Sequence, residues 1–369
     1  MIKLKSIKLN GFKSIRQLDM EFGDMNVLIG VNGAGKSNLI SFFKMLNEMM
    51  SNRLQFFIRE SGSAQSLLHY GAKETPMMEA TLTFEKDSDV SAYYLALKHI
   101  AGDSLAFFDE TLEAKLFQSE NSVPVSLGSG HLETNIKNSG EETYVRARTI
   151  GHLLNNCRPY HFHDTSSLAR VKQHCYVADN SKLLSDAGNL AAVLYRFKIE
   201  KPDIYRTIVS TVQRISPFFD DFELEPTGLS NNETILNWRA RDSDVLFGPH
   251  QISDGTLRAM CLVTLLSLPK NELPELLIVD EPELGLHPYA LNTIAALFNI
   301  ASFHTQVLVS TQSSAFLNNF DPENVIVVDR VGKESRFAKP NIAETREWLE
   351  NYTLGEVWEK NIFGGTPEC

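Results

Sequence analysis

The sequence contains no uninterrupted apolar run of about 18 residues, so we expect no membrane-spanning helix. Its first residues, Met1–Lys5, alternate charged and apolar side chains and lack the apolar core of a signal peptide. Cysteine is scarce, and no two of Cys157, Cys175, Cys261 and Cys369 form a Cys-x-x-Cys pair, so zinc and thioredoxin-type chemistry are not expected. These absences predict a cytoplasmic protein with reduced thiols and no membrane partner.

The sequence also lacks sustained heptads, fixed-period repeats and an excess of positive charge. The missing heptads exclude a long coiled coil. A formal net charge of −11 over 369 residues argues against a surface that binds nucleic acid throughout, although it leaves room for a local basic groove. Five cations cluster near the N-terminus, where a solvated strand face explains them at least as well; they are Lys3, Lys5, Lys8, Lys13 and Arg16.

A glycine-rich loop, Gly30–Ser37, is the most informative stretch that is present. It reads Gly-Val-Asn-Gly-Ala-Gly-Lys-Ser, follows the apolar run Val27–Ile29 and precedes a helix that we predict over residues 38–50. Its glycines let successive N–H groups point at phosphate oxygens, and the helix N-terminus adds positive charge. The predicted ATP-binding residues here are Gly30, Asn32, Gly33, Ala34, Gly35, Lys36, Ser37 and Asn38.

A second apolar run, Leu276–Val279, ends in two carboxylates, Asp280 and Glu281. This pattern predicts a buried parallel strand whose carboxyl end faces a ligand. Together with the Ser37 hydroxyl, Asp280 is expected to hold Mg²⁺. Glu281 is expected to orient or deprotonate the attacking water. Two surface acids after a core strand are the simpler alternative.

Two further segments extend the pattern. Ser253 and Gly255 lie in a Ser-Asp-Gly stretch just before a helix predicted over residues 259–268, where an ordinary helix cap is the alternative. Another strand, predicted over residues 306–310, is followed by Gln312, which we expect to face the γ-phosphate. Earlier in the chain, a helix is expected over residues 186–197 and another after Pro202.

The first half is expected to be rich in strands. Residues 2–9 and 16–22 predict a hairpin whose turn is marked by Asn10-Gly11. Residues 80–84 predict a further strand. A helical piece over residues 90–99 and short strands near 111–117, 122–127 and 143–148 indicate an inserted subdomain, or alternatively extra strands of the first sheet.

In this order, the motifs resemble the ABC-type ATPase heads of the SMC, Rad50 and RecF group, and more closely the stand-alone predicted ATPases of the bacterial RecF-like AAA family. Three further stretches add to the resemblance: Gly11–Ile15, His161–Ser166 and Tyr352–Glu356. The resemblance implies an α/β P-loop NTPase of the ABC-ATPase head type, with mixed sheets and a helical lobe. It implies core segments at residues 1–86 and 246–369, the inserted α+β subdomain at 87–150, and a helical lobe with strands at 151–245.

The resemblance also implies roles for single residues. Glu281 would be the catalytic carboxylate, assisted by Lys36 and Gln312, with ATP and Mg²⁺ as cofactors. Ser253 and Gly255 would act in trans on the γ-phosphate held by a second copy, so that ATP joins two copies head to tail. The loop from Leu284 to His287 would communicate between the two sites.

Two positions depart from that group. Gln312 stands where a histidine is usual, and glutamine cannot carry a proton, so hydrolysis is expected to be slow or Gln312 only senses the phosphate. No glutamine marks the junction between the sheet and the helical lobe. The stretch His161–Asp164 takes that place, where His163 and Asp164 could contact Mg²⁺ or water, or play a structural role.

Two hypotheses for function remain open. In the first, dimerisation is coupled to DNA in repair or in defence against foreign DNA. In the second, the protein is a regulatory ATPase that holds a separately encoded nuclease or toxin, which the acidic charge slightly favours. A scaffold that hardly hydrolyses ATP is the alternative. About forty residues follow the last predicted strand, residues 324–329, too few for a TOPRIM nuclease domain, and their aromatic side chains are expected to pack on the core rather than on a partner.

Overall fold

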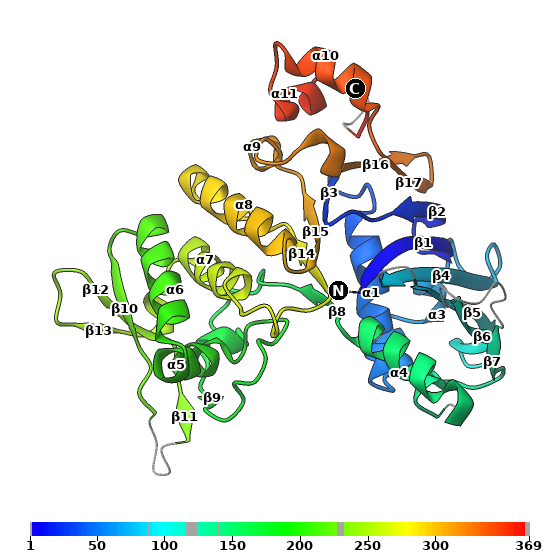
Figure 1. Ribbon diagram of the computed structural model, residues 1–369, viewed down its shortest axis with the longest axis horizontal. Helices are drawn as coiled ribbons and strands as arrows, with labels where there is room; N and C mark the ends of the chain where they lie inside the picture. Colours follow the sequence, from blue (N-terminus) through cyan, green and yellow to red (C-terminus); the bar gives the residue numbers. More distant parts are fainter. Residues whose placement is uncertain (1, 87–88, 116–123, 139–140, 227–231, 366–369) are drawn as a thin grey trace.

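The computed structural model describes residues 2–86, 89–115, 124–138, 141–226 and 232–365. A parallel sheet at the centre lies between an antiparallel sheet and a helical lobe (Figure 1). The α/β class expected from the sequence is confirmed. Cys369 lies outside the described residues, and Cys157, Cys175 and Cys261 are free thiols, as expected.

The central sheet has the strand order β17-β16-β3-β15-β14-β8. Its strands are β3 (Met25–Ile29), β8 (Cys157–Tyr160), β14 (Leu276–Asp280), β15 (Gln306–Thr311), β16 (Val325–Val331) and β17 (Glu334–Ala338). Only β17 pairs antiparallel with its neighbour. Every residue of β3, β14 and β15 is buried, because both faces of these strands are covered. Their carboxyl ends therefore meet at one edge of the sheet.

The antiparallel sheet has the order β2-β1-β4-β5-β6-β7. Its strands are β1 (Lys3–Phe12), β2 (Ile15–Glu21), β4 (Met77–Lys86), β5 (Asp89–Ile100), β6 (Ser104–Lys115) and β7 (Val125–Gly128). The helix predicted over residues 90–99 is wrong, because β5 pairs along its length with both β4 and β6, and Tyr93, Leu95 and Leu97 alternate into the core. Strands β5, β6 and β7 extend the first sheet, which was the alternative, while the domain boundaries stay a prediction.

Two other local predictions are wrong. The hairpin turn lies at Lys13-Ser14 rather than at Asn10-Gly11, because Phe12 pairs with Ile15 and Gly11 stays within β1. Residues 143–148 are helical rather than extended, since they belong to α4 (Glu141–Asn155). The strand predicted near residues 122–127 falls partly outside the described residues, and β7 covers the rest.

The remaining helices are α1 (Lys36–Met50), α2 (Leu54–Glu60), α3 (Ala64–Leu67), α5 (Leu190–Glu200), α6 (Pro202–Ile215), α7 (Asp254–Leu266), α8 (Pro288–Ser302), α9 (Ser314–Leu317), α10 (Ile342–Leu349) and α11 (Leu354–Glu359). Pro202 begins α6, as predicted. The longest described helices, α1, α4 and α8, have 15 residues each, consistent with the expected lack of a long coiled coil. Within the described ranges, no helix is both long and apolar enough to cross a membrane.

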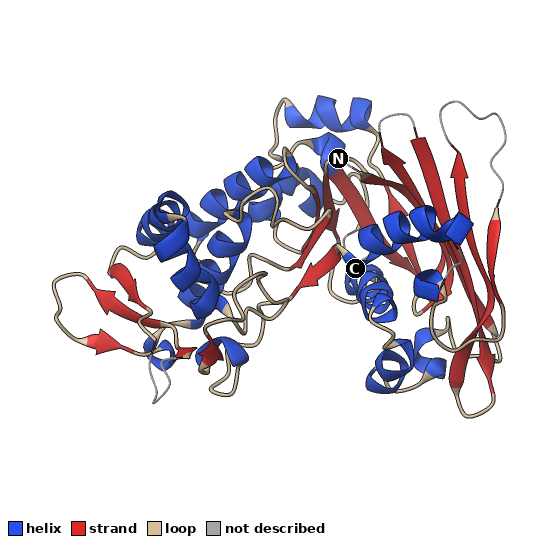
Figure 2. Ribbon diagram, turned by 60° about the horizontal axis from the view of Figure 1, so that its bottom comes forward, coloured by secondary structure: helices blue, strands red, loops and turns tan. Residues whose placement is uncertain are grey.

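The helical lobe carries a small sheet at its far end (Figures 1 and 2). This sheet has the order β10-β12-β13 and consists of β10 (Phe219–Glu223), β12 (Asn237–Ala240) and β13 (Leu246–Phe247). A separate pair joins β9 (Cys175–Tyr176) to β11 (Glu233–Thr234). Residues 233–240 are therefore divided between two sheets, because β11 pairs with β9 and β12 pairs with β10.

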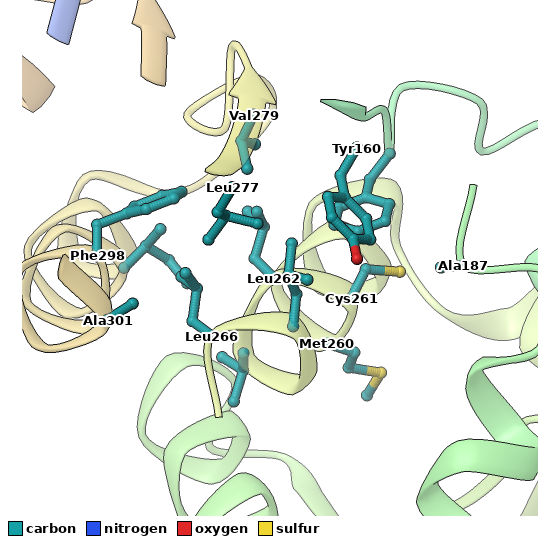
Figure 3. Packing of buried hydrophobic residues seen from close by; sticks show 14 of the residues in the cluster. Tyr160, Ala187, Met260, Cys261, Leu262, Leu266, Leu277, Val279, Phe298 and Ala301 are labelled. Carbon is teal, nitrogen blue, oxygen red and sulfur yellow. The ribbon is translucent and has the colours of Figure 1, made fainter. Parts of the chain in front are cut away.

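Side chains of the central strands alternate between two hydrophobic cores. In β14, Leu276 and Ile278 pack with α1 and the antiparallel sheet, whereas Leu277 and Val279 face the helical lobe. On that second side, α7 places Met260, Cys261, Leu262 and Leu266 against β14, Tyr160 and the α8 residues Phe298 and Ala301 (Figure 3). Helix α1, which begins at the glycine-rich loop, is thus held between the two sheets.

The C-terminal segment packs on the protein's own core, as expected. Leu354 and Trp358 of α11 are buried in the core on the side of the helical lobe. Gly355 lies directly against the backbone of Ser314 in α9, where a side chain would collide with the Ser314 carbonyl group. This close contact explains the glycine in the Tyr352–Glu356 stretch noted in the sequence.

Candidate nucleotide site

The glycine-rich loop joins the end of β3 to the start of α1, as predicted. Gly30 and Gly35 are required by space, because a Cβ on Gly30 would overlap the carbonyl oxygen of Val328 in β16 and one on Gly35 would overlap the hydroxyl of Ser335 in β17. Gly33 (φ 81°) and Gly35 (φ 119°) also have backbone conformations that favour glycine. The loop is therefore shaped by the strands behind it.

The end of α1 at this loop suits an anion. Gly35 is the N-cap residue and offers no side chain to the first N–H groups of the helix, and the first turn, which is fully described, contains no acidic residue. The Lys36 ammonium lies over the loop and donates to the carbonyl oxygens of Gly30 (2.6 Å) and Val31 (3.2 Å). Burial lowers the pKa of Lys36, while Glu281, Asp280 and Glu283 act in the opposite direction.

Asp280 ends β14 beside this loop. Ser37 Oγ donates to Asp280 Oδ2 over 3.1 Å, and the hydroxyl of Ser310 in β15 donates to Oδ1. The two predicted Mg²⁺ ligands are thus brought together, and their oxygen atoms are the donor type that Mg²⁺ prefers. His163 Nε2 donates to the backbone carbonyl of Asp280 over 2.9 Å, which fixes the end of the strand.

Glu281 follows directly and has a positive φ of 44°. This left-handed conformation costs a non-glycine residue roughly 1–2 kcal/mol. Its N–H donates to the Ser310 carbonyl over 2.8 Å, so the neighbouring strand stabilises the conformation. Strained residues of this kind gather at functional sites.

Gln312 follows β15 and is held by Glu283, a residue that the sequence did not single out. Glu283 Oε1 accepts from the Thr311 hydroxyl (2.6 Å) and from the Gln312 N–H (3.1 Å). Burial raises the pKa of Glu283 despite these two hydrogen bonds. The other oxygen, Oε2, is buried without a hydrogen-bond partner among the described residues. Glu283 therefore connects the loop after Glu281 with the backbone of Gln312.

The stretch His161–Asp164 leaves β8 next to Asp280. His161 is largely buried, which lowers its pKa, while the charge of Asp280 acts to raise it. His163 contacts the Asp280 backbone, as described above. Asp164 is exposed and accepts from the N–H of Ser166, so its described contact lies away from the Asp280 carboxylate. The contacts of His163 and Asp164 fit the structural alternative for this stretch.

The Ser-Asp-Gly segment caps α7. Ser253 Oγ accepts from the N–H of Thr256 (3.3 Å), and Gly255 lies so close to Gly285 that a Cβ would overlap the Gly285 carbonyl oxygen. The described contacts of Ser253 and Gly255 thus lie within α7 and with the loop after Glu281, rather than with the phosphate loop of the same chain.

Arg258, one turn further along α7, connects this helix to two other segments. Its guanidinium donates to the carbonyl oxygens of His163 (2.9 Å), Phe162 (3.2 Å) and Leu284 (3.1 Å). The helix that carries Ser253 and Gly255 is therefore tied to the residues that contact Asp280. The sequence offered no signal for this role beyond the position of Arg258 three residues after Gly255.

Two serines that the sequence analysis missed support the loop from behind. Ser335 Oγ donates to the Ala34 carbonyl (2.5 Å) and lies 2.6 Å from Ser14 Oγ. Asn38 directs its side chain to Ser14 Oγ (2.5 Å), toward the β1–β2 turn. Asn32 is exposed in the loop. Ser14 belongs to the Gly11–Ile15 stretch, so that stretch supports the loop's geometry.

Comparison with known proteins agrees with this arrangement. Residues 25–318 match the family described as "AAA domain, putative AbiEii toxin, Type IV TA system". The Old nuclease of Escherichia phage P2 is 23% identical over 392 residues, covering 94% of this chain. The chain spans 62% of the length of that curated relative.

Solved structures of low sequence identity share the fold. The SmcHead bound to the C-winged helix domain of ScpA has a TM-score of 0.60 at 14% identity, covering 94% of this chain and 99% of that one. The Smc head domain with an extended coiled coil from Pyrococcus furiosus, bound to the C-terminal domain of ScpA, has a TM-score of 0.58 at 14% identity. That match covers 95% of this chain and 99% of the other chain. The expected fold of an ABC-type ATPase head is confirmed.

Proposed function

Since the chain belongs to the family described as "AAA domain, putative AbiEii toxin, Type IV TA system" and has the fold of an SMC head, we propose that it binds ATP with Mg²⁺ and hydrolyses it. The observation that carries this proposal is the meeting of three strand ends. The glycine-rich loop, Asp280 and Gln312 follow β3, β14 and β15, which are neighbours in one parallel sheet. Parallel sheets bind ligands at this edge.

Each residue then has a distinct task. The loop N–H groups, the start of α1 and Lys36 would bind the phosphates, for which Lys36 must exchange its contacts with the Gly30 and Val31 carbonyls. Ser37 and Asp280 would hold Mg²⁺, which neutralises charge on the β- and γ-phosphates. Glu281 would orient the attacking water, and Gln312 would donate a hydrogen bond to the γ-phosphate.

The signature at the start of α7 supports a second part of the proposal. Ser253 caps α7 and Gly255 lies against the loop after Glu281 of its own chain, and the two residues would complete the site of a second copy. ATP would then join two copies head to tail, and hydrolysis would separate them. The SMC-head likeness concerns the fold alone, so this assembly is our inference.

We further propose that the ATPase cycle is linked to DNA processing, in repair or defence, through a separately encoded nuclease or toxin effector. The printed name of the phage P2 relative, Old nuclease, supports the link to nucleic acid. Because the chain spans only 62% of that relative, its nuclease activity is not assigned to this chain. A scaffold that binds ATP with little hydrolysis is the alternative, for which the amide of Gln312 is the motivating feature.

The test uses Glu281→Gln, which keeps size and backbone while removing the carboxylate. We expect this variant to bind ATP, to lose turnover by about 10²–10⁴-fold, and to double its mass in solution with ATP and Mg²⁺. Lys36→Ala is the matched control, because it removes the phosphate contact and should have the same mass in solution with and without ATP and Mg²⁺. Wild-type turnover in Glu281→Gln would remove Glu281 from the catalytic role, and an ATP-independent mass would contradict the head-to-tail dimer.

A further inference from the structure

A cleft at the free edge of the central sheet is not used by the proposed ATPase chemistry. It lies beside β8, the edge strand, between α1 and the loop of residues 177–189. Its volume of about 690 Å³ is within the range of small-ligand sites, about 300–1,000 Å³. The lining includes His161, which follows Tyr160 of β8, and Tyr160 pairs with Val279, the residue before Asp280 of the nucleotide site.

Three cations from three different elements line this cleft: Lys44 of α1, Arg158 of β8 and Lys182 of the loop. Arg158 and Lys182 line the same cleft, and the charge of Arg158 is the main cause of a lowered pKa at Lys182. Lys44 contributes to the lowered pKa of His161, after burial. Like charges at short range cost free energy unless an anion separates them.

The acidic residues of the cleft do not neutralise these cations. Glu48 forms an ion pair with Arg53 (2.9 Å), and Asp186 forms one with Arg170 (2.8 Å), two arginines that do not line the cleft. The remaining acid, Asp179, is exposed. Within the described part of the chain, the ion pairs include neither Lys44, Arg158 nor Lys182. Among the described residues of the lining, the charges without an ion-pair partner are therefore three cations and one acid, Asp179, on a protein whose net charge is −11.

The polar groups around the cations suit a phosphate. Ser181 and Ser185 line the same cleft and are exposed, so their hydroxyls can donate to an anion. The aromatic residue of the lining, Tyr160, is only 2% exposed and offers no face on which a base could stack. A ligand would therefore be bound here through its phosphate groups, without discrimination between bases.

We propose that this cleft is a second anion site that binds phosphate groups, supplied by a single-stranded nucleic acid or by a free nucleotide. Arg158 and Lys182 contact the phosphates, and Lys44 adds charge from α1. Binding in this cleft does not require ATP hydrolysis. The cleft proposal can therefore fail while the ATPase proposal stands, and the ATPase proposal can fail while the cleft proposal stands. Because Tyr160 and His161 line the cleft and β8 pairs with β14, an occupied cleft is adjacent to the end of β14.

The test compares Arg158→Gln/Lys182→Gln with Lys270→Gln/Lys339→Gln. Both double variants lose two positive charges, and Lys270 and Lys339 are exposed residues outside the cleft. The probe is fluorescein-labelled oligothymidylate, measured by anisotropy without added nucleotide in a Lys36→Ala background, so that the phosphate-loop lysine does not contribute and no nucleotide competes for the cleft. Loss of two phosphate contacts should weaken binding at low salt and make the slope of log K against log salt shallower by about 1.4. Between 50 and 200 mM salt the control should therefore lose about sevenfold more affinity than the cleft variant.

Thymidine 3′,5′-bisphosphate distinguishes the two sources. If it competes with the oligonucleotide at equal phosphate concentration, the site takes free nucleotides; if only the longer strand binds, the site takes a nucleic-acid backbone. Equal oligonucleotide affinity and salt slope in the cleft variant and its control would overturn the proposal, as would a wild-type protein that binds neither probe. Thermal unfolding and ATP binding of both double variants show that any loss is local.

Discussion

The contact between Gly255 and Gly285 can be tested by adding a single methyl group. In Gly255→Ala, the new Cβ would overlap the Gly285 carbonyl oxygen and lie 3.2 Å from its carbonyl carbon. The loop cannot retreat freely, because Arg258 holds the neighbouring Leu284 carbonyl over 3.1 Å. The start of α7 and the loop after Glu281 must therefore move apart.

Overpacking of this kind costs about 1–3 kcal/mol. For domains of about 150–250 residues, each kcal/mol lowers Tm by about 2–4 °C. Gly248→Ala is the matched control, since Gly248 has a φ of −88° and its added Cβ would lie 3.8 Å from Asn237 Oδ1, an ordinary contact distance. That substitution should leave stability unchanged or raise it by about 0.4–1 kcal/mol, because alanine restricts the unfolded chain.

The assays are thermal unfolding by circular dichroism, ATP affinity and ATP turnover. We expect Gly255→Ala to keep its ATP affinity, because the phosphate loop lies on other elements, and to lose turnover and the ATP-dependent change in mass. Gly248→Ala should resemble the wild type in all three. If the two variants unfold at the same temperature and turn over ATP equally, the close backbone contact does not have the role that we derive from it.

Two further predictions concern buried carboxylates. Burial alone would raise the pKa of Glu272, but hydrogen bonds from Arg196 (2.5 and 3.0 Å) and Lys201 (2.5 Å) outweigh burial and lower it. A carboxylate with a lowered pKa stabilises the folded state at pH values above its unfolded-state pKa of about 4.3, and this stabilisation is lost as the pH falls through the folded-state pKa. Glu272→Gln should therefore lower the free energy of unfolding by about 3 kcal/mol at pH 7 and by progressively less below about pH 4.3. Denaturant unfolding at several pH values measures this. Glu283→Ala removes the acceptor of the Gln312 N–H and should lower kcat at least about tenfold while leaving ATP affinity unchanged. Glu283→Gln keeps an oxygen acceptor and should restore most of kcat. Equal kcat in both variants would refute the positioning role.

The parts of the site that lie within one short segment were predictable from the sequence. Gly30, Lys36 and Ser37 follow a strand at a fixed spacing, and the apolar run before Asp280 identifies a buried strand. Residues that link two elements distant in the sequence were not predictable, because no local pattern connects Glu283 to Gln312. The same limit explains the errors in the fold. Residues 90–99 contain good helix formers, yet pairing with strands on both sides decides their conformation.

The contacts around Arg258 explain how one chain could connect its own nucleotide site to the signature that it offers to another. The Asp280 carbonyl accepts from His163, whose own carbonyl accepts from Arg258 on α7. The end of β14 has no void into which Asp280 could shift, because Val279 and Ile278 beside it are packed in the hydrophobic cores on the two faces of the sheet. Such a shift therefore acts on α7 through directed hydrogen bonds, and α7 carries Ser253 and Gly255 at its start. One physical route between the two half-sites is thus a chain of backbone carbonyls held by His163 and Arg258, beside the direct contact of Gly255 with Gly285.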